Sequence, residues 1–256
     1  MASIHSGRPP IVTLLSDFGT ADAYVAVMKA AVLRLCPSAA LIDVTHAVPP
    51  QDILAAGFPL ERAIAGFDPG TIHVAVVDPG VGTARRILIV EIARQIVICP
   101  DNGLITWTWR RHGGGRTHDV TWRPERPSDV FHGRDIMAPV AGMLAAGEPI
   151  EALSRESEDP MLLEIGIATG RLGRVIHIDG FGNATTNLLT DRVGAKFANV
   201  TVAGRSIGPI RRTYSDVTLG EPLAIIGSSG LLEVAVRNGS AAKQLGITVG
   251  EEVTLE

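Results

Sequence analysis

The sequence predicts an α/β protein: a larger N-terminal domain, with helices on both faces of a mostly parallel sheet, and a smaller C-terminal β domain. In the first half, short apolar runs alternate with segments of helical periodicity. After residue 160, short β-rich runs are separated by Gly-containing turns. Residues 149–160 are polar and bounded by prolines, which is typical of a linker. We therefore expect domains at residues 1–150 and 164–256, joined by a linker at residues 151–163.

The first α/β unit opens with the apolar run 11–15, which predicts a strand. A Ser-Asp-Phe-Gly turn follows, and then residues 24–35 have helical spacing up to Cys36-Pro37. Ligands of α/β proteins bind outside the carboxyl ends of the strands, so Asp17 lies where a carboxylate would bind hydroxyl groups. Capping of the following helix explains Asp17 equally well.

The next segments continue the alternation, with strands at residues 40–44 and 72–77 and a helix at residues 53–64 between them. No GxGxxG or GxxxxGKS motif follows the first strand. We therefore do not expect a ligand held by its phosphates.

A charged turn separates strand 72–77 from another apolar run, residues 87–90. It contains one carboxylate, Asp78, and two guanidiniums, Arg85 and Arg86. Charges beside a core strand are costly unless they are paired, and such costs are common at functional sites. An Asp that caps the turn, with surface arginines, is an equally good interpretation.

The rest of the N-terminal half predicts a strand at residues 95–99, an exposed loop at 110–117 and a helix at 136–146. We expect His112 and His118 to be solvated loop residues. His132 precedes the last helix, where it either points into a cleft or is an ordinary loop residue.

The C-terminal half predicts a small antiparallel barrel or sandwich. Two of its turns contain polar side chains, Asp-Gly-Phe-Gly-Asn at residues 179–183 and Gly-Ser-Ser-Gly at 227–230. Each is also compatible with an ordinary hairpin. The expected strands are residues 171–178, 198–202, 223–226, 231–236 and 252–255.

Composition excludes several classes of protein. The hydrophobic fraction is 46% and the mean hydropathy +0.24, but no run reaches the roughly 20 apolar residues of a membrane helix. The formal net charge is -4, with both signs interspersed, which argues against a nucleic-acid surface. The N-terminus has no signal-peptide pattern, so we expect a cytoplasmic protein. Cys36 and Cys99 read as buried free thiols, and no spacing predicts a metal site.

Taken together, the motifs are more informative than any one of them. Ser-Asp-Phe-Gly at 16–19, Asp-Pro-Gly-Val-Gly-Thr at 78–83, Phe-His-Gly-Arg-Asp at 131–135, and the turns at 179–183 and 227–230 occur in one characteristic order. The chain resembles the S-adenosyl-L-methionine hydroxide adenosyltransferases, which form adenosine and are related to fluorinating and chlorinating enzymes.

The resemblance implies an α/β domain, a C-terminal β-barrel and a homotrimer with active sites between subunits. It implies S-adenosyl-L-methionine as substrate, without a cofactor or metal, and Asp78, Arg85 and His132 as the catalytic residues. Asp17 would bind the ribose hydroxyls. The other expected substrate-binding residues are Asp179, Ser228 and Ser229 for the methionine part, Asn183, Tyr214, Arg237 and Asn238 for adenine, and Phe181 beside them.

Three positions indicate water as the nucleophile. Halogenating relatives have Tyr, Thr and Ser where this chain has Asp78, Val81 and Gly133, so donors for a desolvated halide are missing and a negative charge is added. We expect water to attack the ribose C5′, positioned by Arg85 and Asp78, and to lose its proton to His132, directly or through Asp78. Halide-dependent adenosyl transfer and a non-catalytic adenosine-binding module are the alternatives.

Overall fold

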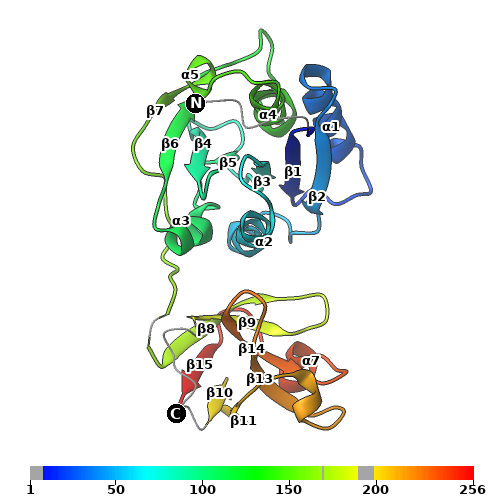
Figure 1. Ribbon diagram of the computed structural model, residues 1–256, viewed down its shortest axis with the longest axis vertical. Helices are drawn as coiled ribbons and strands as arrows, with labels where there is room; N and C mark the ends of the chain where they lie inside the picture. Colours follow the sequence, from blue (N-terminus) through cyan, green and yellow to red (C-terminus); the bar gives the residue numbers. More distant parts are fainter. Residues whose placement is uncertain (1–7, 169, 190–198) are drawn as a thin grey trace. The chain divides into compact units, whose positions relative to one another are not determined.

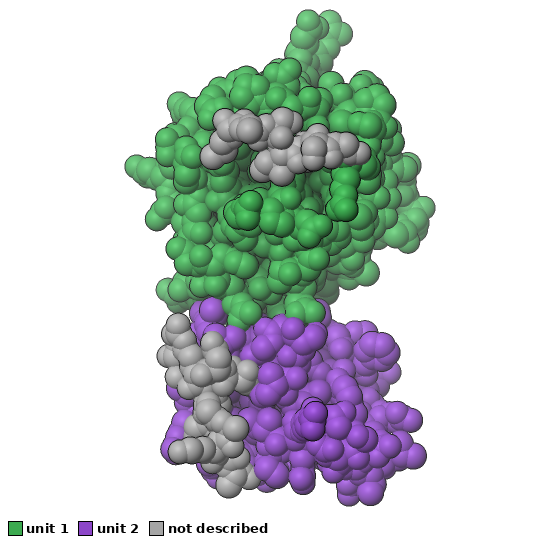
Figure 2. Space-filling model, in the orientation of Figure 1, with its two compact units in different colours: residues 1–165 green, residues 166–256 purple. Residues whose placement is uncertain are grey.

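The computed structural model describes residues 8–168, 170–189 and 199–256. The chain divides into two compact units, residues 1–165 and 166–256, coloured separately in Figure 2. Each unit contains its own sheet and its own hydrophobic core.

The first unit is built on a seven-stranded sheet with the order β2-β1-β3-β5-β4-β6-β7. Strands β2, β1, β3 and β5 are mutually parallel, whereas β4 pairs antiparallel with β5 and β6, and β7 pairs antiparallel with β6. Five strands therefore point one way, which confirms the largely parallel sheet. The strands are β1 (Ile11–Ser16), β2 (Ala40–Thr45), β3 (Ile72–Val76), β4 (Ile87–Ile92), β5 (Gln95–Pro100), β6 (Arg116–Val120) and β7 (Ser154–Glu156).

Helices cover both faces of this sheet (Figure 1). On one face, α1 (Tyr24–Leu35) packs against α4 (Ala138–Ala145), and on the other α2 (Ile53–Gly66) packs against α3 (Thr106–His112). Each face of the sheet has its own hydrophobic core, and successive residues of a strand point to opposite faces. Val74 and Val76 belong to the core beneath α1 and α4, and Ala75 and Val77 to the core beneath α2 and α3. This alternation is why β3 is apolar except for the buried His73.

Two segments contain more regular structure than we expected. Residues 110–117 are not an exposed loop, because they include the end of α3 and the start of β6. His118 on β6 is buried, and its Nε2 lies 3.0 Å from Glu91 Oε1. The prediction that His118 is a solvated loop residue is therefore wrong. The first part of the expected linker belongs to α5 (Ile150–Leu153), which begins one residue before it, and to the edge strand β7. Both segments contain polar side chains that are paired in the folded protein, so the hydropathy pattern does not reveal their regular structure.

The expected helix at residues 136–146 begins earlier, as a π-helical turn, η1 (Gly133–Met137). Pro139 stands at the start of α4 and has no backbone N–H, so it cannot continue the α-helical ladder toward the preceding turn. Ala138 N–H instead bonds to the carbonyl of Gly133. Such π turns are frequent at functional sites, and this one begins directly after His132.

The second unit is a nearly closed, mostly antiparallel barrel with the strand order β11-β10-β15-β8-β9-β14-β13-β12. Its interior is aliphatic, for example Val175, Val202, Val234 and Val253. The barrel is therefore the correct one of the two β architectures. Its elements are β8 (Leu172–Ile178), β9 (Ala184–Leu189), β10 (Val200–Val202), β11 (Arg205–Gly208), β12 (Ile210–Arg211), η2 (Tyr214–Asp216), β13 (Pro222–Ile226), β14 (Leu231–Val236), α7 (Ala241–Leu245) and β15 (Glu252–Leu255).

Cys36 and Cys99 are both buried free thiols, as predicted. Burial raises the pKa of the Cys99 thiol, which makes it a poor nucleophile. Among the described residues, no helix has the length and apolarity needed to cross a bilayer.

Candidate functional site

In the first unit, the carboxyl ends of β1 and β3 and the start of η1 surround one open cavity of about 350 Å³. Asp17 follows β1, Asp78 follows β3, and His132 precedes η1. Parallel strands bring their carboxyl ends to one edge of the sheet, so residues 17 and 78 meet although they are far apart in sequence. The cavity is lined by Asp17, Phe18, Pro50, Gln51, Val76, Asp78, Pro79, Val81, Val130, Phe131, His132 and Gly133.

Arg85 connects the two other predicted catalytic residues. Its Nε donates to Asp78 Oδ1 at 2.6 Å, and its Nη2 donates to Asp78 Oδ2. The same Nη2 lies 3.0 Å from His132 Nδ1. The side chains of Arg85 and Asp78 are only 8% and 6% exposed, so this is a buried bidentate ion pair.

The charged turn is therefore paired rather than scattered over the surface. Arg85 holds Asp78, while the adjacent Arg86 contacts the carboxylates of Asp101 and Asp119. Nη1 of Arg85 is also buried, and it has no hydrogen-bond partner among the described residues. Buried N–H groups without an acceptor are uncommon in folded proteins.

The contact with Arg85 determines the tautomer of His132. A guanidinium has only donors, so His132 Nδ1 must accept, and a neutral imidazole then carries its proton on Nε2. Burial lowers the pKa of His132 from its ordinary value of 6.5, and the nearby positive charge of Arg85 lowers it further, although Asp78 opposes the shift. The neutral form of His132 is thus favoured near neutral pH.

Asp17 is held by the loop that follows β2. Its Oδ2 accepts the backbone N–H of Gln51 at 2.8 Å, and its Oδ1 has no partner among the described residues. Gln51 has a φ of 65°, which is unusual for a residue other than glycine. Gln51 is not among the residues predicted for the site, although its Pro-Pro-Gln-Asp context already marks a turn.

Two small or apolar residues complete the wall near the trio. Val81 lines the cavity and offers no donor. A Cβ atom at Gly133 would lie 3.2 Å from Val76 Cγ1 and 3.3 Å from Met28 Sδ. The site therefore has little room for a side chain at position 133.

The remaining eight predicted residues lie in the second unit. Asp179 organises the turn between β8 and β9: its Oδ1 accepts the N–H groups of Phe181 and Asn183, each at 2.9 Å. Asn183 Nδ2 donates to Asp179 Oδ2 at 3.0 Å. Asn183 is buried, whereas Phe181 is 80% exposed. The turn thus exposes the Phe181 ring, while the hydrogen bonds to Asp179 hold the turn together.

Arg237 and Asn238 lie near this turn, because the end of β14 pairs with the start of β9. Arg237 Nη1 donates to the carbonyl of Val217 at 2.6 Å. Ser228 and Ser229 occupy the hairpin turn at the other end of β14. Between these positions, Tyr214 donates its hydroxyl to Glu233 Oε1 at 3.1 Å.

Tyr214 is half-exposed, but its environment is acidic. Partial burial and the charge of Glu233 raise the pKa of Tyr214 to about 12. The phenol is therefore neutral and available as a donor across the physiological range.

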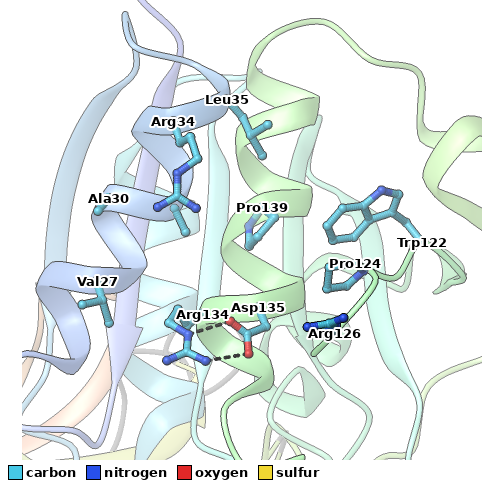
Figure 3. A pocket seen from close by; sticks show the side chains of 11 residues that line it. Val27, Ala30, Arg34, Leu35, Trp122, Pro124, Arg126, Arg134, Asp135 and Pro139 are labelled. Atoms are coloured by element: carbon cyan, nitrogen blue, oxygen red, sulfur yellow. Dashed lines mark hydrogen bonds and ion pairs between the residues drawn. The ribbon is translucent and has the colours of Figure 1, made fainter. Parts of the chain in front are cut away.

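A second cavity in the first unit, of about 470 Å³, lies between α1, α4 and the segment around Trp122 (Figure 3). Its walls are mainly apolar, and its acidic side chain, Asp135, is bonded to Arg134 at 2.6 and 2.7 Å. It is larger than the cavity at Asp78, but it contains none of the predicted residues. Across the described residues, no cluster of three or more His, Cys, Asp or Glu could hold a metal ion.

Comparison with known proteins places this geometry in a family. Residues 12–154 match the SAM hydroxide adenosyltransferase N-terminal domain, and residues 173–254 match the corresponding C-terminal domain. The chain is 42% identical to an (R)-S-adenosyl-L-methionine hydrolase of Thermus thermophilus, covering 95% of this chain and 98% of the relative. A hydrolase of the same name from Salinispora tropica is 35% identical over 95% and 97% of the two chains.

More distant and structural matches agree. A fluorinase of Nocardia brasiliensis is 27% identical, covering 98% of both chains. A crystal structure of an uncharacterised conserved protein from Thermotoga maritima superposes with a TM-score of 0.89 at 33% identity, covering 96% of this chain and all of that one. On both domain matches and on identity along nearly its whole length, the chain belongs to the SAM hydroxide adenosyltransferase family.

Proposed function

We propose that this protein hydrolyses S-adenosyl-L-methionine to adenosine and L-methionine. The observation that carries the proposal is the buried Asp78-Arg85 pair, joined to His132 and facing the same cavity as Asp17. The named hydrolases among its relatives act on the (R) form, so we assign the (R) configuration at sulfur to the substrate.

The reaction is a displacement at the ribose C5′. A C5′–O bond forms as the C5′–S bond breaks, and the bonding electron pair passes to sulfur, so methionine leaves as a neutral thioether. The positively charged sulfur is already a good leaving group and needs no general acid. The protein must therefore align a water molecule and accept one proton.

Asp78 is placed to orient this water and take its proton. Each carboxylate oxygen has two lone-pair positions, and Arg85 occupies one on each oxygen, which leaves one position on each oxygen that a water molecule can use. Once attack has begun, the oxygen is strongly acidic, so a carboxylate is a sufficient base.

For His132 we propose a role other than the expected one of accepting the proton. Its Nδ1 lone pair is engaged by Arg85, so in this arrangement it cannot accept a proton until that contact breaks. We assign to it the task of holding Arg85 and offering its Nε2–H to an oxygen in the site.

The alternative of halide transfer is less well supported by the cavity. Val81 provides no donor for a desolvated halide, and Asp78 would repel it. A non-catalytic adenosine-binding module would not need the buried pair of Asp78 and Arg85, whose desolvation is costly.

The complete site also requires residues of the second unit. We propose a homotrimer in which the second unit of one subunit supplies Asp179, Phe181 and Asn183 to the cavity of its neighbour. The resemblance to the family supports this arrangement, as does the openness of the cavity in the first unit.

The direct test is incubation of the protein with each sulfonium epimer, followed by chromatography. We expect adenosine and methionine in equal amounts from the (R) epimer, at a rate unchanged by added chloride or fluoride. A halogenated deoxyadenosine would identify a halogenase, and adenosine binding without turnover would identify a binding module. Either result would refute the proposal.

A further inference from the structure

A chain of four side chains connects the surface of the first unit to the loop that carries Asp17. Lys29 Nζ donates to Asp43 Oδ2 at 2.6 Å. Asp43 Oδ1 lies 3.1 Å from His46 Nε2, a close ion-pair contact without the geometry of a hydrogen bond. His46 Nδ1 lies 2.8 Å from Ser16 Oγ. Ser16 directly precedes Asp17. The inner two residues, His46 and Ser16, are 7% and 1% exposed.

The residues around His46 indicate which atom donates and which accepts in each of these contacts. The nearby Asp43 carboxylate favours the His46 tautomer with its proton on Nε2, in which Nδ1 accepts the hydroxyl proton of Ser16. Ser16 Oγ in turn accepts the backbone N–H of Phe18 at 3.3 Å. The turn around Asp17 is thus anchored on a buried imidazole.

A second contact, through the backbone, reinforces the first. The N–H of Gly19 donates to the carbonyl of His46 at 2.8 Å. Asp17 therefore lies between two residues, Ser16 and Gly19, that are both attached to His46. The same loop also supplies Gln51, whose N–H holds Asp17 Oδ2.

The local sheet geometry shows how His46 reaches β1. Leu14 is opposite Asp43, but Leu15 is opposite Thr45, so β2 contains one extra residue at this point. Such bulges re-aim the side chains that follow them and are common beside active sites. A buried imidazole is costly unless it is hydrogen-bonded, so an aliphatic residue would be the cheaper choice for packing alone.

We infer that His46 is a positioning residue: through Ser16 and Gly19 it holds the Asp17 carboxylate in the orientation that binds the ribose hydroxyls. This inference rests on the proposed function, in which Asp17 contacts the ribose. It predicts an effect on recognition of the hydroxyls and not on the rest of the nucleoside.

The test compares the binding of adenosine and 2′,3′-dideoxyadenosine by calorimetry. His46→Leu and Ser16→Ala should each weaken adenosine binding by about tenfold, the value of one well-placed hydrogen bond. Binding of the dideoxy compound should be unchanged. His46→Asn, whose amide can replace the Nδ1 contact with Ser16, should restore most of the affinity for adenosine.

His118→Leu is the matched control, because His118 is also buried and also faces a carboxylate, that of Glu91, but lies outside the cavity. It should leave both affinities unchanged. With S-adenosyl-L-methionine, the Ser16→Ala variant should show a raised KM and a nearly unchanged kcat, which a general loss of structure would not produce.

Equal losses for the two nucleosides, or a loss in His118→Leu as large as in His46→Leu, would overturn the positioning role. If His46→Leu does not fold, Ser16→Ala decides the question, because it removes only one oxygen atom. Failure of the wild-type protein to bind adenosine would instead refute the proposed function, and the inference with it.

Discussion

At the scale of single residues, the central feature is a buried carboxylate that is paired with a guanidinium. Arg85 grips Asp78 through both oxygens and reaches His132 with the same nitrogen. The three side chains therefore act as one unit, and their contributions to the rate will not be additive. Two predictions follow from their contacts, and a third concerns the neighbouring Gly133.

Replacing Asp78 by Asn should reduce kcat by about 10²-fold or more and change KM little, because the acceptor for the water's proton is lost while the substrate contacts remain. Steady-state kinetics test this directly. Asp119→Asn is the control, since Asp119 also pairs with an arginine but lies outside the cavity. A kcat of Asp78→Asn within a few fold of wild type would contradict the role.

Replacing His132 by Asn preserves an acceptor for Arg85 and removes the titratable imidazole. If His132 holds Arg85, this variant should lose much less activity than His132→Ala. In the wild-type protein the lowered pKa of His132 places its protonation below pH 6.5, so activity should persist under mildly acidic conditions. Equal, large losses in both variants would show that the basic imidazole is required.

Replacing Gly133 by Ser introduces the residue of the halogenating relatives into a space closed by Val76 and Met28. Because the neighbours must move by a few tenths of an ångström, we expect a loss of about 1–3 kcal/mol in the free energy of unfolding. Halide-dependent products should not appear. If the crowding is the cause, Gly133→Ser should cost less stability in a Met28→Ala background than in the wild-type protein.

At the scale of secondary structure, a buried polar network joins the central strands of the first unit. Thr13 on β1 lies 2.7 Å from His73 Nδ1 on β3, and His73 Nε2 lies 2.6 Å from Gln95 Oε1 on β5. Gln95 continues the network to the carbonyls of Ile64 and Phe67 on the α2 side. Each member has a partner, so the network also favours one register of the three strands.

This network predicts a pH dependence of stability. Burial lowers the pKa of His73, against the opposing hydrogen bond to Gln95, so the unfolded chain binds its proton more readily than the folded protein. Stability should therefore fall as the pH decreases below about 6.5, by up to about 1.4 kcal/mol per pH unit for this one group.

Urea unfolding at several pH values, followed by tryptophan fluorescence, measures this effect in the first unit, where Trp107, Trp109 and Trp122 all lie. His73→Val should be less stable at pH 8 but should show a flatter pH dependence between pH 6.5 and 5. An unchanged slope in this variant would assign the pH dependence to other groups.

At the scale of the whole molecule, the predicted site residues are divided between two compact units. If the site forms between subunits, a subunit defective only in its first unit can be complemented by one defective only in its second. Co-expression of Asp78→Ala with Asn183→Ala, each inactive alone, should restore about a quarter of the wild-type activity. Each site takes its first unit from one subunit and its second unit from another at random, so about one site in four has both units intact. No recovery in the mixed oligomer would place the complete site within one chain.

The sequence by itself determined the alternation of strands and helices, the change to β structure after residue 160, and the family. Apolar runs such as β3 and β14 carry their own signal, because buried strands need aliphatic side chains. The ordered set of motifs also indicated Asp78, Arg85 and His132 together, although each motif alone was ambiguous.

Only the tertiary structure decided the features that depend on hydrogen-bond partners distant in sequence. Strand β6 has a single aliphatic residue, Val120, and its buried Thr117 and His118 are satisfied by Ser157, Glu158 and Glu91. Likewise, the tautomer of His132 follows from one contact with Arg85, 47 residues away in sequence. Periodicity reports on hydrophobic burial, whereas a buried polar group is specified by its hydrogen-bond partner, and that partner is known only when the chain is folded.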